Sequence, residues 1–117
     1  MFEGENPVNL KIDIQQNEQQ YYVKLAGEID AYTAPELKDK FMSMTEQTNP
    51  QITVDFTNVA YMDSTGLGVF IALLKAIKKT EGSLKFVGVS ERLKRLFDIT
   101  GLTEILNLNS QVEGGIK

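Results

Sequence analysis

The sequence predicts an α/β fold, a mixed sheet of four to five strands with helices packed against it. In four stretches apolar residues alternate with polar ones, which is the period of a half-buried strand. Between the later stretches apolar residues recur at helical spacing instead. Strand–helix–strand units need right-handed crossovers, which lay their helices against the sheet. A chain of 117 residues is long enough for one such domain, over 1–117, and too short for two.

The first half of the chain predicts a β-hairpin followed by a helix. Residues 8–14 and 21–25 form the two strands, with a polar turn between them. Residues 26–32 break the alternation and are expected to form a loop. A helix of about a dozen residues comes next, because its apolar residues have helical spacing. Thr33 and Glu36 have the spacing of a capping box at its start.

The second half of the chain predicts alternating strands and helices. The expected elements are, in order, a strand over 52–56, a helix over 64–79, a strand over 84–89, a helix over 91–100 capped by Ser90 and ended by Gly101, and a short helix or edge strand over 102–108. The two ends of the chain, about 1–7 and 110–117, are expected to be frayed.

Composition excludes several kinds of function. The chain has no cysteine and no histidine, so it can form no disulfide, thiolate metal site or serine–histidine nucleophile pair. Its net charge of −4 disfavours nucleic acid as a partner. The first residues have neither the basic start nor the apolar block that a signal peptide would need, so we expect them not to be one. There is no apolar run near the ~20 residues of a membrane helix, and neither GxxxxGK nor GxGxxG occurs. We therefore expect a cytoplasmic protein with no metal, cofactor, nucleic-acid partner or membrane partner.

The stretch over 61–70, Tyr-Met-Asp-Ser-Thr-Gly-Leu-Gly-Val-Phe, is the most informative part of the sequence. Asp63 and Ser64 are both good helix N-caps, since a side-chain oxygen there accepts an otherwise unpaired N–H. Gly66 and Gly68 each cost a helix about 0.5–1 kcal/mol relative to alanine. We interpret the two glycines as a place of close approach, where backbone lies open to another molecule.

Four functions for this stretch remain open on chemistry alone. Asp63 and Ser64 could simply cap the helix, or one of them could react in a hydrolase or phosphocarrier. The helix N-terminus could bind a nucleotide. Finally, Ser64 could be the substrate of another protein's kinase, because the dipole and N–H groups of a helix N-terminus tolerate a phosphoserine.

Glu28, Asp30 and Tyr32 form a second candidate cluster in the predicted loop after the second strand. They could be a solvated turn. In a mixed sheet, however, loops at one end of the strands converge, which would bring this loop beside Ser64. Asp30 and Asp63 would then repel a phosphate on that serine, and a partner would meet the crowded negative charge.

Three stretches, in order and spread over nearly the whole chain, resemble the STAS-domain anti-sigma-factor antagonists of bacteria. They are Leu-Ala-Gly-Glu-Ile-Asp at 25–30, Tyr-Met-Asp-Ser-Thr-Gly-Leu-Gly-Val at 61–69, and Glu-Arg-Leu-Lys-Arg-Leu-Phe-Asp-Ile-Thr-Gly-Leu at 91–102. The middle stretch carries the family's specific Asp-Ser-(Ser/Thr)-Gly motif. The likeness is strongest to the members that control the general stress response, and it implies the STAS-domain fold.

The resemblance implies that Ser64 is phosphorylated and that the chain is a substrate with no catalytic residue of its own. In the family, the kinase is the anti-sigma factor itself, an ATP-dependent serine kinase. The unphosphorylated antagonist binds that kinase and frees the sigma factor, and a PP2C-type phosphatase reverses the phosphorylation. The family's Gly-Glu-(Leu/Ile)-Asp loop is part of the partner surface. Together with the residues above, the expected partner-binding set is Gly27, Glu28, Ile29, Asp30, Tyr32, Asp63, Ser64, Thr65, Gly66, Leu67 and Gly68.

Overall fold

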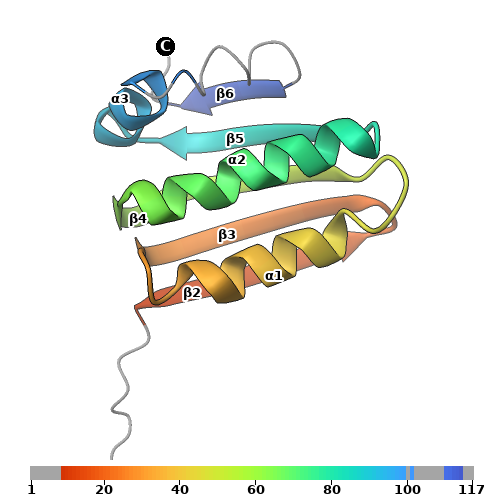
Figure 1. Cartoon of the computed structure of the whole chain (residues 1–117), viewed down its shortest axis with the longest axis horizontal. Helices are drawn as coiled ribbons and strands as arrows, with labels where there is room; N and C mark the ends of the chain where they lie inside the picture. Colours follow the sequence, from red (N-terminus) through yellow and green to blue (C-terminus); the bar gives the residue numbers. More distant parts are fainter. Residues whose placement is uncertain (1–8, 100, 102–109, 115–117) are drawn as a thin grey trace, which may run out of the picture.

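A computed structural model describes residues 9–99, 101 and 110–114 of the chain. In this part of the chain a single five-stranded sheet has the order β2-β3-β4-β5-β6 (Figure 1). The strands are β2 (Leu10–Asn17), β3 (Gln20–Ile29), β4 (Gln51–Met62), β5 (Ser83–Val89) and β6 (Ser110–Gly114). β2 runs antiparallel to β3, and the other neighbours are parallel. The predicted fold class, a mixed sheet with helices packed against it, is confirmed.

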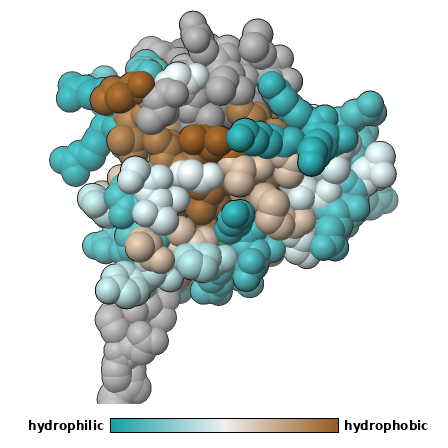
Figure 2. Space-filling model, viewed as in Figure 1, coloured by the Kyte–Doolittle hydropathy of each residue, from teal (hydrophilic) through white to brown (hydrophobic). Residues whose placement is uncertain are grey.

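The helices are α1 (Ala34–Met44), α2 (Ser64–Lys79) and α3 (Glu91–Ile99). In Figure 1, α1 and α2 lie side by side on one face of the sheet, and α3 follows the end of β5. Hydrophilic side chains are spread over this helix-bearing face, at its edges and across its middle, and hydrophobic surface is concentrated in its upper left part (Figure 2). None of the helices in the described part of the chain has the length and apolar character that a membrane crossing needs.

Aromatic rings form the centre of the core between the helices and the sheet. The rings come from both helical and strand elements, and each is at most 1% exposed: Phe41, Phe56, Phe70, Phe86 and Phe97. Neighbouring ring centroids lie 4.9–5.8 Å apart, mostly edge to face or tilted, which aromatic pairs prefer. This packing fixes α1, α2 and α3 on β4 and β5.

The second strand is longer than the sequence predicts. Ala26, Gly27, Glu28 and Ile29 belong to β3, so the prediction of a loop over 26–32 is wrong for these four residues. The alternation of buried and exposed side chains along β3 breaks because the register of β3 against β4 shifts twice. The shifts lie between Lys24 and Ala26 and between Gly27 and Glu28. Gly27 has a φ of +119° and packs against the backbone of Asn9, where a side chain would not fit.

The start of α1 also differs from the prediction. Thr33 takes the N-cap position, but its side chain makes no capping hydrogen bond, so the predicted capping box with Glu36 is wrong. The Thr33 hydroxyl instead turns back to the preceding segment and donates to the Glu28 carbonyl oxygen at 2.9 Å. Thr33, which was predicted to cap α1, therefore stabilises the turn that precedes the helix.

Other helix boundaries agree with the sequence. α2 spans the predicted range of 64–79. The Ser90 hydroxyl oxygen accepts the Leu93 N–H at 3.2 Å, and Gly101 has the expected positive φ, +79°.

The predicted fraying of 110–117 is wrong for Ser110–Gly114, because these residues pair with β5 as β6. The predictions for 1–7 and 102–108 lie outside the described residues.

A carboxylate on the sheet face away from α1 and α2 stabilises β4 where its pairing with β5 breaks off. Asp55 accepts hydrogen bonds from the Tyr22 hydroxyl at 2.8 Å, the Thr57 N–H at 2.9 Å and the Thr57 hydroxyl at 2.6 Å. Partial burial acts to raise the pKa of Asp55, but the bonds from Thr57 and Tyr22 and the charge of Lys24 outweigh it and lower the pKa. The same bond to Asp55, with desolvation, raises the pKa of Tyr22.

These shifts predict a pH-dependent contribution of Asp55 to stability. Because its pKa is lower in the folded than in the unfolded chain, the stabilisation is present above the unfolded pKa and is lost as pH falls through the folded pKa. Urea unfolding of the wild type and of Asp55→Asn should therefore differ at pH 7 and converge at acid pH. Tyr22→Phe should reduce this pH dependence. A difference between wild type and Asp55→Asn that stays constant across the acid range would contradict the assignment.

Candidate functional site

The structure brings the two candidate stretches together at the carboxyl ends of β3 and β4. Glu28 is paired with Tyr61 and Ile29 with Met62, in parallel register. At the next residue the Asp63 N–H donates to the Ile29 carbonyl oxygen at 3.2 Å. The end of β3 and the start of α2, on the left of Figure 1, are therefore neighbours, although they lie far apart in the sequence.

Asp63 is the residue that caps α2. Its backbone is extended (φ −108°, ψ −172°), and Oδ1 accepts the Gly66 N–H at 3.0 Å. Such a cap contributes about 1 kcal/mol of stability. Ser64 is the first helical residue rather than the cap, and both it and Thr65 are exposed. The Ser64 hydroxyl therefore stands at a helix N-terminus where anions are favoured, and the cap does not depend on it.

The two glycines of the motif serve different purposes. A Cβ atom on Gly66 would lie 2.6 Å from Cγ2 of Ile29 and 2.7 Å from its carbonyl oxygen, so only glycine lets α2 begin this close to β3. Around Gly68, by contrast, a Cβ atom would meet nothing within 4 Å, and the residue is exposed. The close approach at Gly66 is internal to the chain, whereas Gly68 leaves bare backbone on the surface.

Burial divides the predicted partner-binding residues into two groups. Ile29 is 0% and Leu67 3% exposed, and Gly66 is buried as well, so these three residues lie beneath the predicted contact surface and not on it. They support it from beneath, because Ile29 and Leu67 join the apolar core and Gly66 packs directly against Ile29. The residues of the predicted set that remain at the surface are Gly27, Glu28, Asp30, Tyr32, Asp63, Ser64, Thr65 and Gly68, with Gly27, Asp30 and Asp63 only partly exposed.

A tight turn connects β3 to α1 within this surface. Oδ1 of Asp30 accepts the N–H groups of Tyr32 at 2.9 Å and Thr33 at 3.1 Å. The Thr33 hydroxyl oxygen accepts the Asp30 N–H at 2.9 Å. Sequence reasoning did not assign this role to Thr33, although an Asp followed three residues later by Thr is the pattern of such side-chain-bonded turns.

Tyr61 is a second surface residue that the sequence analysis did not select. It is 46% exposed and sits opposite Glu28 in the β3–β4 register. Its position could not be deduced from the sequence, because the alternation of β4 slips between Phe56 and Val59, which are both buried. The surface therefore combines carboxylates, hydroxyls and two exposed tyrosine rings.

The candidate surface carries hydroxyl, carboxylate and aromatic side chains. Among the described residues, no group of three or more acidic, histidine or cysteine side chains could hold a metal ion. The whole sequence has no histidine to activate the Ser64 hydroxyl. The site offers exposed hydroxyls, acidic neighbours and two aromatic rings, which are groups that another macromolecule could contact.

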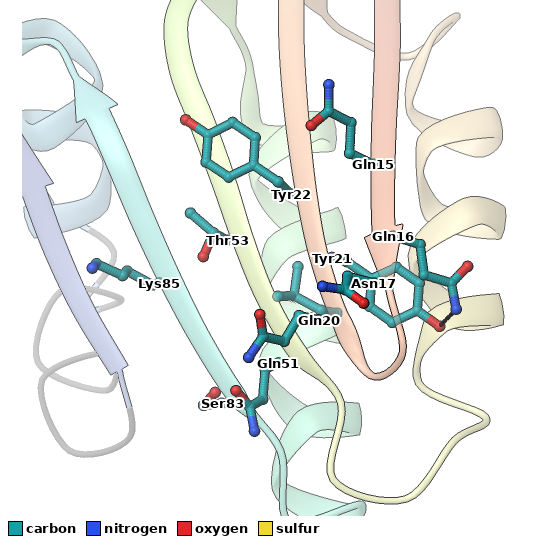
Figure 3. Close-up of a pocket in the computed structure, with 11 residues that line it drawn as sticks. Gln15, Gln16, Asn17, Gln20, Tyr21, Tyr22, Gln51, Thr53, Ser83 and Lys85 are labelled. Carbon is teal, nitrogen blue, oxygen red and sulfur yellow. Dashed lines mark hydrogen bonds between the residues drawn. The ribbon is translucent and has the colours of Figure 1, made fainter.

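A hollow of about 530 Å³ lies at the opposite end of the sheet, on the face away from α1 and α2 (Figure 3). One row of its lining crosses four strands in register, from Gln15 through Tyr22 and Thr53 to Lys85. Its other lining residues include the first residues of β3, β4 and β5. Since Ser64 follows the carboxyl end of β4, the hollow and the Ser64 surface are separate features.

Comparison with known proteins identifies relatives over nearly the full length. The model of the STAS domain family matches residues 11–115. The anti-sigma-B factor antagonist of Bacillus subtilis (strain 168) is 47% identical over 110 residues, which cover 94% of this chain and 100% of the relative. The protein of the same name from Staphylococcus epidermidis is 43% identical over 106 residues, 91% of this chain and 98% of the relative.

Solved structures share the fold at lower identity. An anti-sigma factor antagonist from Mycobacterium paratuberculosis superposes with a TM-score of 0.72 at 24% identity, covering 84% of this chain and 83% of that one. The Bacillus cell fate determinant SpoIIAA in its phosphorylated form gives a TM-score of 0.70 at 17% identity, covering 87% of this chain and 90% of that one. At these identities the superpositions show a common fold.

The contrast between Gly66 and Gly68 gives a matched pair of variants. Gly66→Ala should lower the free energy of unfolding by about 1–3 kcal/mol, because the new methyl group meets Ile29 backbone that cannot move aside. Gly68→Ala should raise it by about 0.5–1 kcal/mol, because the methyl group points into open space and alanine favours helix. Urea unfolding measures both. Equal effects of the two variants would show that α2 does not begin in contact with β3.

Proposed function

The chain belongs to the STAS-domain anti-sigma-factor antagonists, and from this membership we propose that it switches a sigma factor on by binding the anti-sigma factor that holds it. In this proposal the unphosphorylated chain occupies the anti-sigma factor, which then releases the sigma factor for transcription. Identity of 42–47% to anti-sigma-B factor antagonists over more than nine-tenths of the chain supports this role, and it favours the general stress response as the pathway. A transcription switch of this kind acts in the cytoplasm.

We propose that the anti-sigma factor is also a serine kinase, and that it phosphorylates Ser64 to end the interaction. One observation supports this proposal: Ser64 is the exposed first residue of α2, next to the end of β3, which carries Glu28 and leads into the turn at Asp30. A phosphoserine adds about −1.5 to −2 charge. The helix N-terminus tolerates that charge, so the fold survives while the surface changes.

A phosphate on Ser64 would block binding of the anti-sigma factor both electrostatically and sterically. Glu28, Asp30 and Asp63 already make the surface acidic, and a phosphate on Ser64 would crowd more negative charge into it. A partner that approaches the bare backbone at Gly68 would also meet the added phosphate volume. Because Gly66 is packed on Ile29, the start of α2 has no room to withdraw towards the sheet. A PP2C-type serine phosphatase would restore the binding form.

The proposal predicts a single, kinase-dependent phosphate. Purified chain incubated with ATP should take up one phosphate when the cognate anti-sigma factor is present and none alone, measured by intact mass. Ser64→Ala should abolish uptake and leave thermal stability nearly unchanged, since Asp63 supplies the cap. The neighbouring exposed hydroxyl gives the control, because Thr65→Ala should still be phosphorylated. Self-labelling or ATP turnover by the chain alone would favour a phosphocarrier or nucleotide-binding function instead.

A charge placed at Ser64 should reproduce the phosphorylated state. Ser64→Asp should keep the fold, because an acidic residue suits the first turn of a helix, and should weaken binding to the anti-sigma factor. Isothermal titration calorimetry measures the affinity. Ser83→Asp adds the same charge at the exposed start of β5, at the other end of the sheet, and should bind like the wild type. Tight binding by Ser64→Asp would contradict the charge block.

A further inference from the structure

Tyr32 is by far the most exposed aromatic residue in the described part of the chain. Its side chain is 88% exposed, against 46% for Tyr61 and 38% for Tyr22. Singly exposed large rings are common on protein surfaces, so exposure alone does not indicate a function. The position of Tyr32 adds to it, because Tyr32 stands on the turn between β3 and α1, just after the end of β3 that pairs with the residues preceding Asp63 and Ser64.

Four hydrogen bonds hold the backbone on which Tyr32 stands. The Asp30 carboxylate accepts the N–H of Tyr32 itself, at 2.9 Å, and that of Thr33 at 3.1 Å. The Thr33 hydroxyl accepts the Asp30 N–H and donates to the Glu28 carbonyl oxygen, both at 2.9 Å. The turn is also continuous with α1, whose first residue, Ala34, donates to the Asp30 carbonyl oxygen at 2.8 Å.

We propose that Tyr32 is an aromatic anchor that inserts into an apolar pocket of the anti-sigma factor, and that Thr33 is the positioning residue that holds it ready. This inference rests on the proposed function. It identifies Tyr32 and Thr33 as two residues on which the affinity of the chain for the anti-sigma factor would depend. Exposed aromatic rings dominate binding energy when they fill a desolvated pocket on the partner. Fixing the ring's backbone before binding lowers the entropy lost on association, which is the general advantage of preorganisation.

The surroundings of Tyr32 specify the chemistry of the partner surface. Glu28 and Glu36 are exposed on either side of it in the sequence, and the Asp30 carboxylate lies within the turn. No basic residue occurs between Glu28 and Glu36. The complementary surface is therefore an apolar pocket with arginine or lysine side chains at its rim. A phosphate on Ser64 would not fill this pocket, so anchor and switch act at different points of one interface.

The anchor is tested by the affinity of the full-length chain for the cognate anti-sigma factor, measured by calorimetry. Tyr32→Ala should raise the Kd about 30-fold, the effect of removing a typical binding hot spot. Tyr32→Phe keeps the ring and should bind nearly as well as the wild type. Tyr22→Ala removes a partly exposed tyrosine near the start of β3, at the other end of the sheet, and should leave the Kd unchanged.

The positioning role is tested by a double-mutant cycle. Thr33→Val keeps the shape of the side chain but removes the hydroxyl, and should weaken binding, whereas Thr33→Ser should restore it. In the Tyr32→Ala background, Thr33→Val should have no further effect on the Kd, because there is no ring left to position. A purely structural role for Thr33 would lower thermal stability and weaken binding equally in both backgrounds, which would overturn the positioning assignment.

The outcomes separate this inference from the proposed function. If the wild-type chain does not bind the anti-sigma factor, the proposed function fails and the anchor fails with it. If the wild type binds and Ser64→Asp does not, but Tyr32→Ala binds as the wild type does, the switch stands and the anchor is overturned. Because Tyr32 is almost fully exposed, its substitution leaves the core intact and this test does not depend on a destabilised variant.

Discussion

The contact between Gly66 and Ile29 is the constraint on which the rest of the surface depends. A strand end and a helix start can approach this closely only where a residue has no side chain, and a Cβ atom on Gly66 would lie 2.7 Å from the Ile29 carbonyl oxygen. That same oxygen accepts the Asp63 N–H at 3.2 Å, and Asp63 caps α2 by accepting the Gly66 N–H at 3.0 Å. The packing contact, the hydrogen bond at the strand end and the helix cap therefore all involve the same three residues, Ile29, Asp63 and Gly66.

Because of this contact, two short segments that are distant in sequence act as one rigid surface. The turn after β3 is held by Asp30 and Thr33, and the start of α2 is held by Asp63 and Gly66. Behind both lies the apolar core. A surface built this way loses little conformational freedom when it binds, and a charge added at one point cannot be relieved by a local movement. The internal packing thus determines which groups of the two segments are presented at the surface.

Local rules of sequence predicted the parts of this arrangement that local forces determine. The range of α2 followed from its helical apolar spacing and its polar start, and the convergence of the two candidate segments followed from parallel strand topology. The extension of β3 through Ile29 could not be predicted, because two register shifts interrupt its alternation. The roles of Thr33 and Ile29 depend on tertiary contacts: a capping-box pattern was overridden by a bond to the Glu28 carbonyl oxygen, and a predicted contact residue proved to be fully buried.

The division of tasks between Asp63 and Ser64 explains how a hydroxyl at this position can be modified without loss of the fold. If Ser64 were the cap, its oxygen would be needed by a first-turn N–H, and esterification by phosphate would compete with that bond. With Asp63 in the cap position, the helix start is already satisfied and the Ser64 oxygen is available to a kinase. The dipole at the same terminus then offsets part of the added charge. Under the proposed switch, a phosphate on Ser64 would therefore change the charge and volume presented to a partner, while the packing of Gly66 on Ile29 beneath it would be preserved.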